Sequence, residues 1–446
     1  MKRTVFPTCI SSVLGLLAFA SPLARTTEPA PASPATPAPP PPLKDSHGNT
    51  LRRAPTGHIT NYDEDKVPPY VLPDPLVLQD GRPVRDANTW FKERRPEILR
   101  LYTTQVFGRV PANAPKVTSE VVETDPAAME GRAVRKLVAV HFGDKPDGPV
   151  VHLHVYLPAK ATAPVPVLLH LVFFGNPPIP GAPPPPAPPA GPARRFNEAG
   201  PIADILARGY GYATFRYTEL QPDSPNTFQS GVIGLALAPG ETKPAADEWG
   251  TIGAWAWGAS RVLDYFATDS AIDARRVALI GHSRLGKTVL WAGAQDPRFA
   301  LVFSSCAGEM GSALSRRDYG ETIDDMAAGF GYQFAGNFQK YPGHWNDLPV
   351  DAHLLIALHA PRPVFITAGT EDLWSDPRGE FLAEVAAGPV YRLLGRKDLG
   401  TSELSLDTPL ITGDLGFHEH TGGHTITAAD WKAFLDFADK YLQSAR

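Results

Sequence analysis

The sequence predicts an α/β fold with a mostly parallel central sheet and helices on both faces. Apolar runs of strand length, such as Val277–Ile280, alternate along the chain with segments of helical periodicity, such as residues 247–267. Strands that alternate with helices are typical of parallel sheets, because each parallel connection needs a crossover that usually contains a helix. Hydrophobic residues make up 43% of the 446 residues, which is enough for an ordinary core.

The expected elements follow in order along the chain. Two strands at 134–142 and 150–158 are predicted to form an antiparallel pair. Later strands are expected at 165–174, 210–217, 276–281, 300–306 and 362–369, and helices at 247–267, after Gly286 and from Ala428 to about Leu442. Ligands of such sheets bind at the carboxyl ends of the strands, so the residues that follow these runs are expected to face one crevice.

The first 20 residues have the pattern of a secretory signal peptide. Two basic residues precede an apolar stretch, and Ala18-Phe19-Ala20 fits the cleavage site of such signals. The apolar stretch is shorter than the roughly 20 residues of a membrane span. Residues 21–45 are rich in Pro, Ala and Thr and predict a linker, so the folded domain would cover 46–446. We expect a secreted or periplasmic protein.

Charge and cysteine content exclude other classes. The net charge of −5 and the lack of a basic run argue against a nucleic-acid partner. Once the signal is removed, Cys306 would be the only cysteine, so no internal disulfide can form. Stability must therefore come from the core.

The motif GHSRLGK (281–287) follows an apolar run directly and opens a segment of helical periodicity. A serine at the joint between a strand and a helix has the position of a nucleophile elbow. The usual elbow is G-x-S-x-G, whereas here an arginine follows Ser283 directly and the second glycine comes three residues after it. The motif is either a plain turn that holds a serine or an elbow with an added charged element.

A serine hydroxyl is a poor nucleophile until a base takes its proton and a third group orients that base. In α/β-hydrolases these groups occur in the order Ser, acid, His. Asp372 follows the strand expected at 362–369, and His424 lies just before Thr427, the expected N-cap of the last helix, where Asp430 would complete a capping box. We therefore choose Asp372 as the acid and His424 as the base.

Neighbouring residues of the same types have simpler interpretations. His418 and His420 are expected to be loop histidines in solvent. Asp376 precedes a proline and fits a turn residue. Arg284 and Lys287 would be surface cations at an ordinary helix start, although cations there oppose the helix dipole. Their presence instead indicates an anionic or polyhydroxylated substrate, and a cation beside the nucleophile can stabilise an oxyanion.

The motif GHSRLGK resembles the G-C/H-S-R-x-G-K signature of the glucuronoyl esterases, carbohydrate esterase family 15. The likeness spans roughly residues 60–443 and includes FFGN (173–176), EDLWSDPRGEF (371–381) and GGHTITAADWKAFLDFADKYL (422–442). The resemblance implies an α/β-hydrolase fold without cofactor or metal. It also implies a carboxylic ester hydrolase, a 4-O-methyl-glucuronoyl methylesterase, which cleaves the ester between 4-O-methyl-glucuronic acid of glucuronoxylan and lignin alcohols.

Residue roles are implied by the same match. Ser283 would be the nucleophile and His424 the base, and Arg284 would complete the oxyanion hole. The sugar hydroxyls would be contacted by Lys287, Glu321 and Trp374. Taken alone, Glu321 would be a surface-loop residue, and Trp374 would equally fit a core aromatic.

The acid departs from the fungal pattern. Fungal members carry a glutamate shortly after the strand that follows the elbow helix, and Cys306 occupies that position here. Glu309, three residues further on, is an alternative acid. Asp372 matches the acid that bacterial members carry after the later strand, so we expect Asp372 to serve.

Two other functions stay open at this point: a serine esterase for acetylated xylan or other small esters, and a hydrolase-fold protein that binds saccharides without turnover. The expected partner is a glucuronoxylan or lignin–carbohydrate ester, with no nucleic acid and no membrane, and the chain is expected to be a monomer. The proline tract at 177–192 follows a strand end, and proline cannot continue a ladder. We expect this tract to be a mobile loop that rims the crevice.

Overall fold

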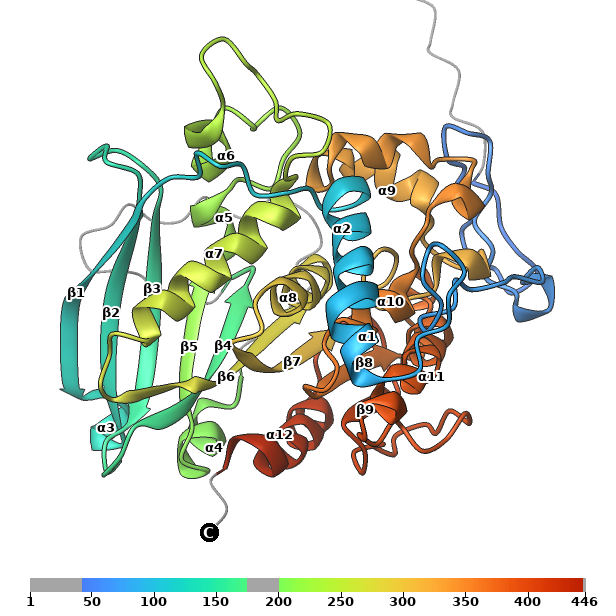
Figure 1. Cartoon of the computed structure of the whole chain (residues 1–446). Helices are drawn as coiled ribbons and strands as arrows, with labels where there is room; N and C mark the ends of the chain where they lie inside the picture. Colours follow the sequence, from blue (N-terminus) through green and yellow to red (C-terminus); the bar gives the residue numbers. More distant parts are fainter. Residues whose placement is uncertain (1–41, 175–199, 444–446) are drawn as a thin grey trace, which may run out of the picture. The chain divides into compact units, whose positions relative to one another are not determined.

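The computed structural model describes residues 42–174 and 200–443, and the part from Leu43 onward forms one compact unit (Figure 1). The expected signal peptide, the linker up to residue 41 and the proline tract at 177–192 lie outside the described residues. Within the two described ranges, no helix combines the length and apolar character that crossing a membrane requires.

In the two described ranges, nine strands form a single sheet in the order β1-β2-β3-β5-β4-β6-β7-β8-β9. The first three pairings are antiparallel, as predicted for β2 and β3, and the five pairings from β5 to β9 are parallel. The bounds are β1 Val117–Ala127, β2 Ala133–Phe142, β3 Val150–Pro158, β4 Val165–Val172, β5 Gly211–Arg216, β6 Ile272–His282, β7 Phe299–Ser305, β8 Val364–Gly369 and β9 Leu415–His420. The predicted mixed, mostly parallel sheet is confirmed.

Helices connect these strands (Figure 1). Short ones are α1 Ala87–Thr89, α3 Ala128–Gly131, α4 Ile202–Ala207, α5 Tyr217–Leu220, α6 Gly231–Ala236, α9 Ile323–Phe330 and α10 Ala352–Ala357. Long ones are α2 Arg95–Gln105, α7 Thr251–Phe266, α8 Arg284–Gln295, α11 Pro377–Leu393 and α12 Ala428–Leu442. The helices expected after Gly286 and at Ala428–Leu442 correspond to α8 and α12.

Both faces of the sheet are covered because the central strands alternate their side chains. In β4, Val167 and Leu169 belong to the core under α7, α8 and α11, whereas Leu168 belongs to the core under α4 and α12. In β6, Leu279 belongs to the first of these cores and Ile280 to the second. Successive side chains along a strand point to opposite faces of the sheet, so a continuous apolar run such as β4 is buried on both sides.

The elements that the sequence did not predict include two strands and one long helix. β1 is an edge strand with mostly exposed, polar side chains, so it carries no apolar run. The sequence of β9 is typical of a loop, because three of its six residues are His or Glu (LGFHEH). α11 contains Pro389 within its length, which sequence patterns take as a helix breaker.

Candidate active site

Ser283 lies between the end of β6 and the first residue of α8, in a strained conformation with φ 58° and ψ −129°. A positive φ is costly for a residue other than glycine and is found where the surroundings enforce it. A Cβ atom at Gly281 would lie 2.2 Å from the Leu285 carbonyl oxygen, and one at Gly286 would lie 2.9 Å from Ser304 Oγ on β7. Both glycines are therefore needed for the turn, which has the geometry of a strand–elbow–helix joint and is not a plain turn.

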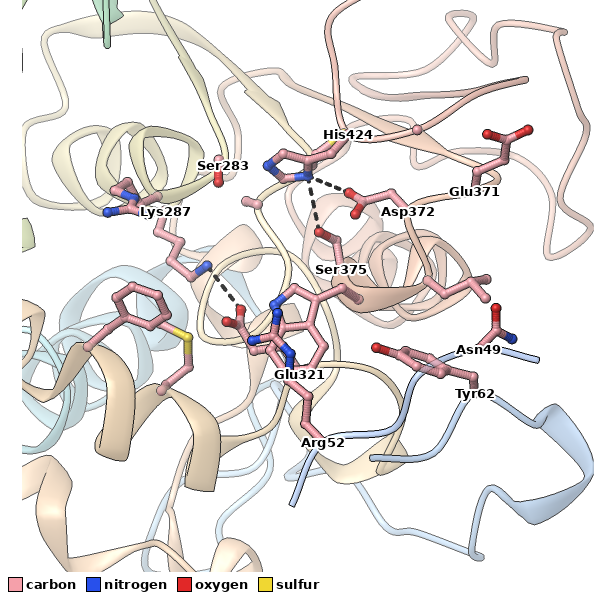
Figure 2. Close-up of a pocket in the computed structure, with 18 of the residues that line it drawn as sticks. Asn49, Arg52, Tyr62, Ser283, Lys287, Glu321, Glu371, Asp372, Ser375 and His424 are labelled. Atoms are coloured by element: carbon pink, nitrogen blue, oxygen red, sulfur yellow. Dashed lines mark hydrogen bonds and ion pairs between the residues drawn. The ribbon is translucent and has the colours of Figure 1, made fainter. Parts of the chain in front are cut away.

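His424 lies opposite this elbow (Figure 2). Its Nδ1 is 2.6 Å from Asp372 Oδ2, and Ser375 Oγ is 3.4 Å from the same nitrogen. An ionised carboxylate only accepts hydrogen bonds, so the Nδ1–H donates to Asp372 and Nε2 is left as the basic nitrogen. Figure 2 shows one edge of the ring directed toward Ser283 and the other toward Asp372 and Ser375.

Glu309 and Cys306, the other candidates for the acid, have different surroundings. Glu309 is buried and accepts a hydrogen bond of 2.6 Å from the Ser315 hydroxyl. Burial raises the pKa of the Glu309 carboxyl well above its usual range, which favours the neutral acid. The structure thus brings Asp372, and not Glu309, to the imidazole of His424.

Cys306 lines the same cavity and is 1% exposed. Its sulfur and the ligand atoms of Asp372 and His424 lie within 4.8 Å of one another, and this is the one such group among the described residues with donor types that suit a metal. Burial, reinforced by the nearby carboxylates, raises the pKa of the thiol well above its usual range, so it is protonated.

The two cations of the elbow are not surface residues. Lys287 is 5% exposed, and its Nζ lies 3.8 Å from Glu321 Oε2, which is also buried. Burial lowers the pKa of Lys287, opposed by Glu321, and burial raises the pKa of Glu321, opposed by Lys287. Arg284 is partly buried and forms an ion pair with Asp223. The surface interpretations of Arg284, Lys287 and Glu321 are therefore wrong.

Trp374 contacts both Glu321, another residue expected to bind the sugar, and Arg52, which the sequence analysis did not single out. Its backbone carbonyl accepts a 2.8 Å hydrogen bond from the Glu321 N–H, and the guanidinium of Arg52 lies 4.1 Å from its ring centroid. Trp374 is half-buried at the cavity wall and is not a core aromatic.

Arg52 belongs to residues 43–66, which we call the N-terminal strap. Asn49, Thr50, Arg52 and Tyr62 of the strap line the cavity (Figure 2). Several hydrogen bonds fix the strap to the loop after η3 (Ser315–Arg317). Among them, Gly320 N–H donates to the Asn61 carbonyl at 2.8 Å, and His58 Nε2 lies 2.8 Å from Asp318 Oδ1. No sequence motif marks these residues, because the strap carries neither an apolar run nor a catalytic signature.

All seven predicted site residues line one cavity of about 580 Å³. Its wall also contains residues that sequence reasoning missed, among them Ser375, Gln333 and Phe330. Ser375 could have been found, because it lies within the same EDLWSDP stretch as Asp372. The cavity therefore joins a serine, a base with its acceptor, and a polar pocket with charges of both signs.

His418 and His420 are not loop histidines in solvent, and that expectation is wrong. Both lie on β9, are at most 2% exposed, and pair through Nδ1 with Asp430. Asp430 also completes the predicted capping box with Thr427, so one buried carboxylate joins β9 to the start of α12. Asp376 is not an ordinary turn residue: it is the buried N-cap of α11, where it accepts the Gly379 N–H at 2.9 Å and pairs with Arg317.

The chain is similar to known esterases. Residues 244–395 match the family described as glucuronyl esterase, fungi. A carbohydrate esterase from an unknown prokaryotic organism is 42% identical over 402 residues, which cover 86% of this chain and 92% of the relative.

Solved structures agree. A glucuronoyl esterase from Solibacter usitatus is 41% identical, with a TM-score of 0.76 over 84% of this chain and 99% of that chain. A family 15 glucuronoyl esterase from Teredinibacter turnerae is 34% identical, with a TM-score of 0.75 over 88% of this chain and 96% of that chain. The chain therefore belongs to carbohydrate esterase family 15, the glucuronoyl esterases, and shares their α/β-hydrolase fold and their class, the carboxylic ester hydrolases.

Proposed function

We propose that this esterase hydrolyses the ester between 4-O-methyl-glucuronic acid side groups of glucuronoxylan and lignin alcohols. One observation carries the proposal: the elbow serine and the His424–Asp372 pair share a cavity with the buried pair of Lys287 and Glu321. A buried cation and a buried carboxyl group side by side suit a polyhydroxylated sugar, because together they supply donors and acceptors to neighbouring hydroxyls. The names of the related glucuronoyl esterases support the same substrate class.

The proposed mechanism passes through an acyl-enzyme. Ser283 Oγ attacks the ester carbonyl carbon while His424 Nε2 takes the hydroxyl proton, and Asp372 stabilises the resulting imidazolium. The carbonyl oxygen becomes an oxyanion, to which the Arg284 guanidinium and backbone N–H groups at the start of α8 donate. The C–O bond to the alcohol then breaks, and the alcohol leaves with the proton from His424.

Water completes the cycle. His424 takes a proton from a water molecule, whose oxygen attacks the acyl carbon. The bond from that carbon to Ser283 Oγ then breaks, His424 returns the proton to Oγ, and the free glucuronic acid leaves. Each step uses only the side chains already named, with Trp374, Lys287 and Glu321 holding the sugar throughout.

The test compares kcat/KM of the purified protein on an aryl-alkyl glucuronate ester and on an aryl acetate. The proposal expects a clear preference for the glucuronate ester and no turnover of either substrate by Ser283→Ala, with the melting temperature unchanged. A preference for the acetate would indicate an esterase for acetylated xylan or small esters. Failure of a fluorophosphonate probe to label the wild type would indicate a saccharide-binding protein without turnover.

Export is part of the same proposal, because a cell-wall polymer is accessible only outside the cell. The signal-like pattern that ends in Ala18-Phe19-Ala20 supports it. Mass spectrometry of the protein recovered from the medium or periplasm of its host should show a chain that begins after Ala20. A full-length chain confined to the cytoplasm would contradict export.

A further inference from the structure

The Asp223 carboxylate, which lies beside the elbow, accepts four hydrogen bonds. Asp223 lies just after α5, at the carboxyl end of β5, and its side chain is 6% exposed. Oδ2 accepts from the Arg284 guanidinium and, at 2.7 Å, from the Tyr217 hydroxyl. Oδ1 accepts at 2.9 Å from both the Tyr332 hydroxyl and the Gln333 side-chain amide.

These four donors come from separate parts of the chain. Tyr217 lies on α5, Arg284 on α8, and Tyr332 and Gln333 on η4 (Gly331–Gln333). A buried carboxylate is costly unless its oxygens are satisfied. Here both oxygens are bonded, so a rotation of the carboxylate would break at least two bonds at once. Asp223 is therefore held in one orientation before any substrate binds.

Arg284 is fixed in turn. Among the described residues, Asp223 is its only recorded hydrogen-bond acceptor, so most of its five N–H donors stay available for a ligand. The rings of Phe330 and Phe173 lie 5.2 Å and 5.9 Å from the guanidinium carbon. An arginine side chain has several rotatable bonds and loses rotamer freedom when it is held in one geometry. The ion pair and the two rings remove much of this freedom in advance.

We propose that Asp223 is a positioning residue, which holds the Arg284 guanidinium where the oxyanion forms. The inference rests on the proposed function, because it assigns Arg284 to the oxyanion. A preorganised donor stabilises charge that develops in the transition state without reorganising during the reaction. A carboxylate next to a cation also reduces the net charge of the pair, which by itself would weaken the contact with the oxyanion, and the variants below separate the two effects.

The central variant is Asp223→Asn, which keeps the shape and an acceptor oxygen but removes the charge. Positioning predicts that kcat on the glucuronate ester falls by about 10- to 100-fold while KM changes less than about threefold. Asp273→Asn is the matched control: Asp273 is also buried and paired with arginines, Arg275 and Arg276, but at the opposite end of β6. The control should retain the wild-type kcat whatever its effect on the melting temperature.

A double-mutant cycle distinguishes positioning from general damage. If Asp223 acts through Arg284, Asp223→Asn should cost little further kcat in an Arg284→Ala background, because the group it positions is gone. Multiplicative losses, an unchanged or increased kcat in Asp223→Asn, or a change confined to KM would each overturn the proposal.

A second variant keeps the carboxylate in case Asp223→Asn does not fold. The double variant Tyr217→Phe/Tyr332→Phe removes one hydroxyl donor from each carboxylate oxygen. It should lower kcat several-fold, and this loss should vanish in the Arg284→Ala background; full activity would overturn the proposal. Failure of the proposed function is recognised separately, because the wild type itself would then prefer another ester or show no turnover.

Discussion

Asp372 Oδ2 lies 2.6 Å from His424 Nδ1, on the side of the imidazole that faces away from the nucleophile elbow. The carboxylate therefore fixes the tautomer in which Nε2 is basic. Glu309, which follows the strand end where fungal relatives are expected to carry their acid, is bonded to Ser315 instead.

Asp372→Asn should lower kcat by about three to four orders of magnitude, because an asparagine favours the wrong tautomer and cannot stabilise the imidazolium. Steady-state kinetics on the glucuronate ester measure this loss. Glu309→Gln is the matched control. Burial raises the pKa of its carboxyl and so favours the neutral form, which an amide resembles, so the replacement should cost little kcat. Cys306→Ser should also retain most activity. An inactive Glu309→Gln beside an active Asp372→Asn would refute the assignment.

Arg284→Ala should reduce turnover more than binding. An oxyanion donor acts mainly in the transition state, and the loss of one such donor typically costs about 2.7–4 kcal/mol. The expected result is a fall in kcat with KM nearly constant. An increase in KM alone would make Arg284 a clamp for the bound substrate.

Lys287→Ala and Trp374→Ala should weaken kcat/KM for the glucuronate ester far more than for the aryl acetate, because the acetate has no sugar to contact. The ratio of the two specificity constants is the measurement. Lys287→Ala also leaves Glu321 buried without its partner, so the melting temperature is recorded for each variant. Equal losses on both esters would indicate a structural role.

Arg52→Ala tests the contribution of the strap. Arg52 covers one face of the Trp374 ring at the cavity wall, whereas its neighbour Arg53 bonds to the Gly57 carbonyl and does not line the cavity. We expect Arg52→Ala to raise KM for the glucuronate ester several-fold and Arg53→Ala to leave it unchanged. If both variants had the same KM, Arg52 would have no specific role in substrate binding, and the strap would only form part of the cavity wall.

Glu380→Gln tests a buried carboxyl group below the loop after β7. Glu380 Oε1 accepts from Gly308 N–H at 2.6 Å and from the Ser312 hydroxyl at 2.7 Å. Burial raises its pKa to about 8, only partly opposed by these two bonds. Between its unfolded value of 4.5 and about 8 the folded chain holds a proton that the unfolded chain has lost, so stability falls as pH rises through this window.

The amide of Glu380→Gln keeps the acceptor and removes the titration. The melting temperature of this variant relative to the wild type should therefore be higher at pH 8 than at pH 5, as measured by calorimetry at both values. A difference that does not change with pH would show that Glu380 does not titrate in this window.

Local signals account for the parts of the fold and site that the sequence predicts. β4 and β6 are buried on both faces, so their apolar runs are continuous, and the elbow places two glycines where side chains would collide with α8 and β7. The capping box at Thr427 likewise involves only neighbouring residues. Each of these features is encoded within a few positions of the chain.

Features that depend on distant partners could not be predicted. Asp223 is an ordinary loop aspartate until Arg284, 61 positions later, meets it. His418 and His420 read as solvent histidines because the sequence does not show that Asp430 satisfies both in the interior. The position of Arg52 at the cavity wall depends on its contact with the Trp374 ring, which is far away in the sequence. In each case the decisive contact joins residues that no local pattern relates.

The strap has a consequence for the order in which the enzyme becomes competent. Its pocket-lining residues are among the first of the folded unit to leave the ribosome, yet their anchors at Asp318 and Gly320 and the base at His424 are made much later. Contacts of such large sequence separation form slowly and cannot form on a partial chain. Activity should thus be a late event of folding, which appears only after the strap has met the loop after η3 and the segment that carries His424 has been made.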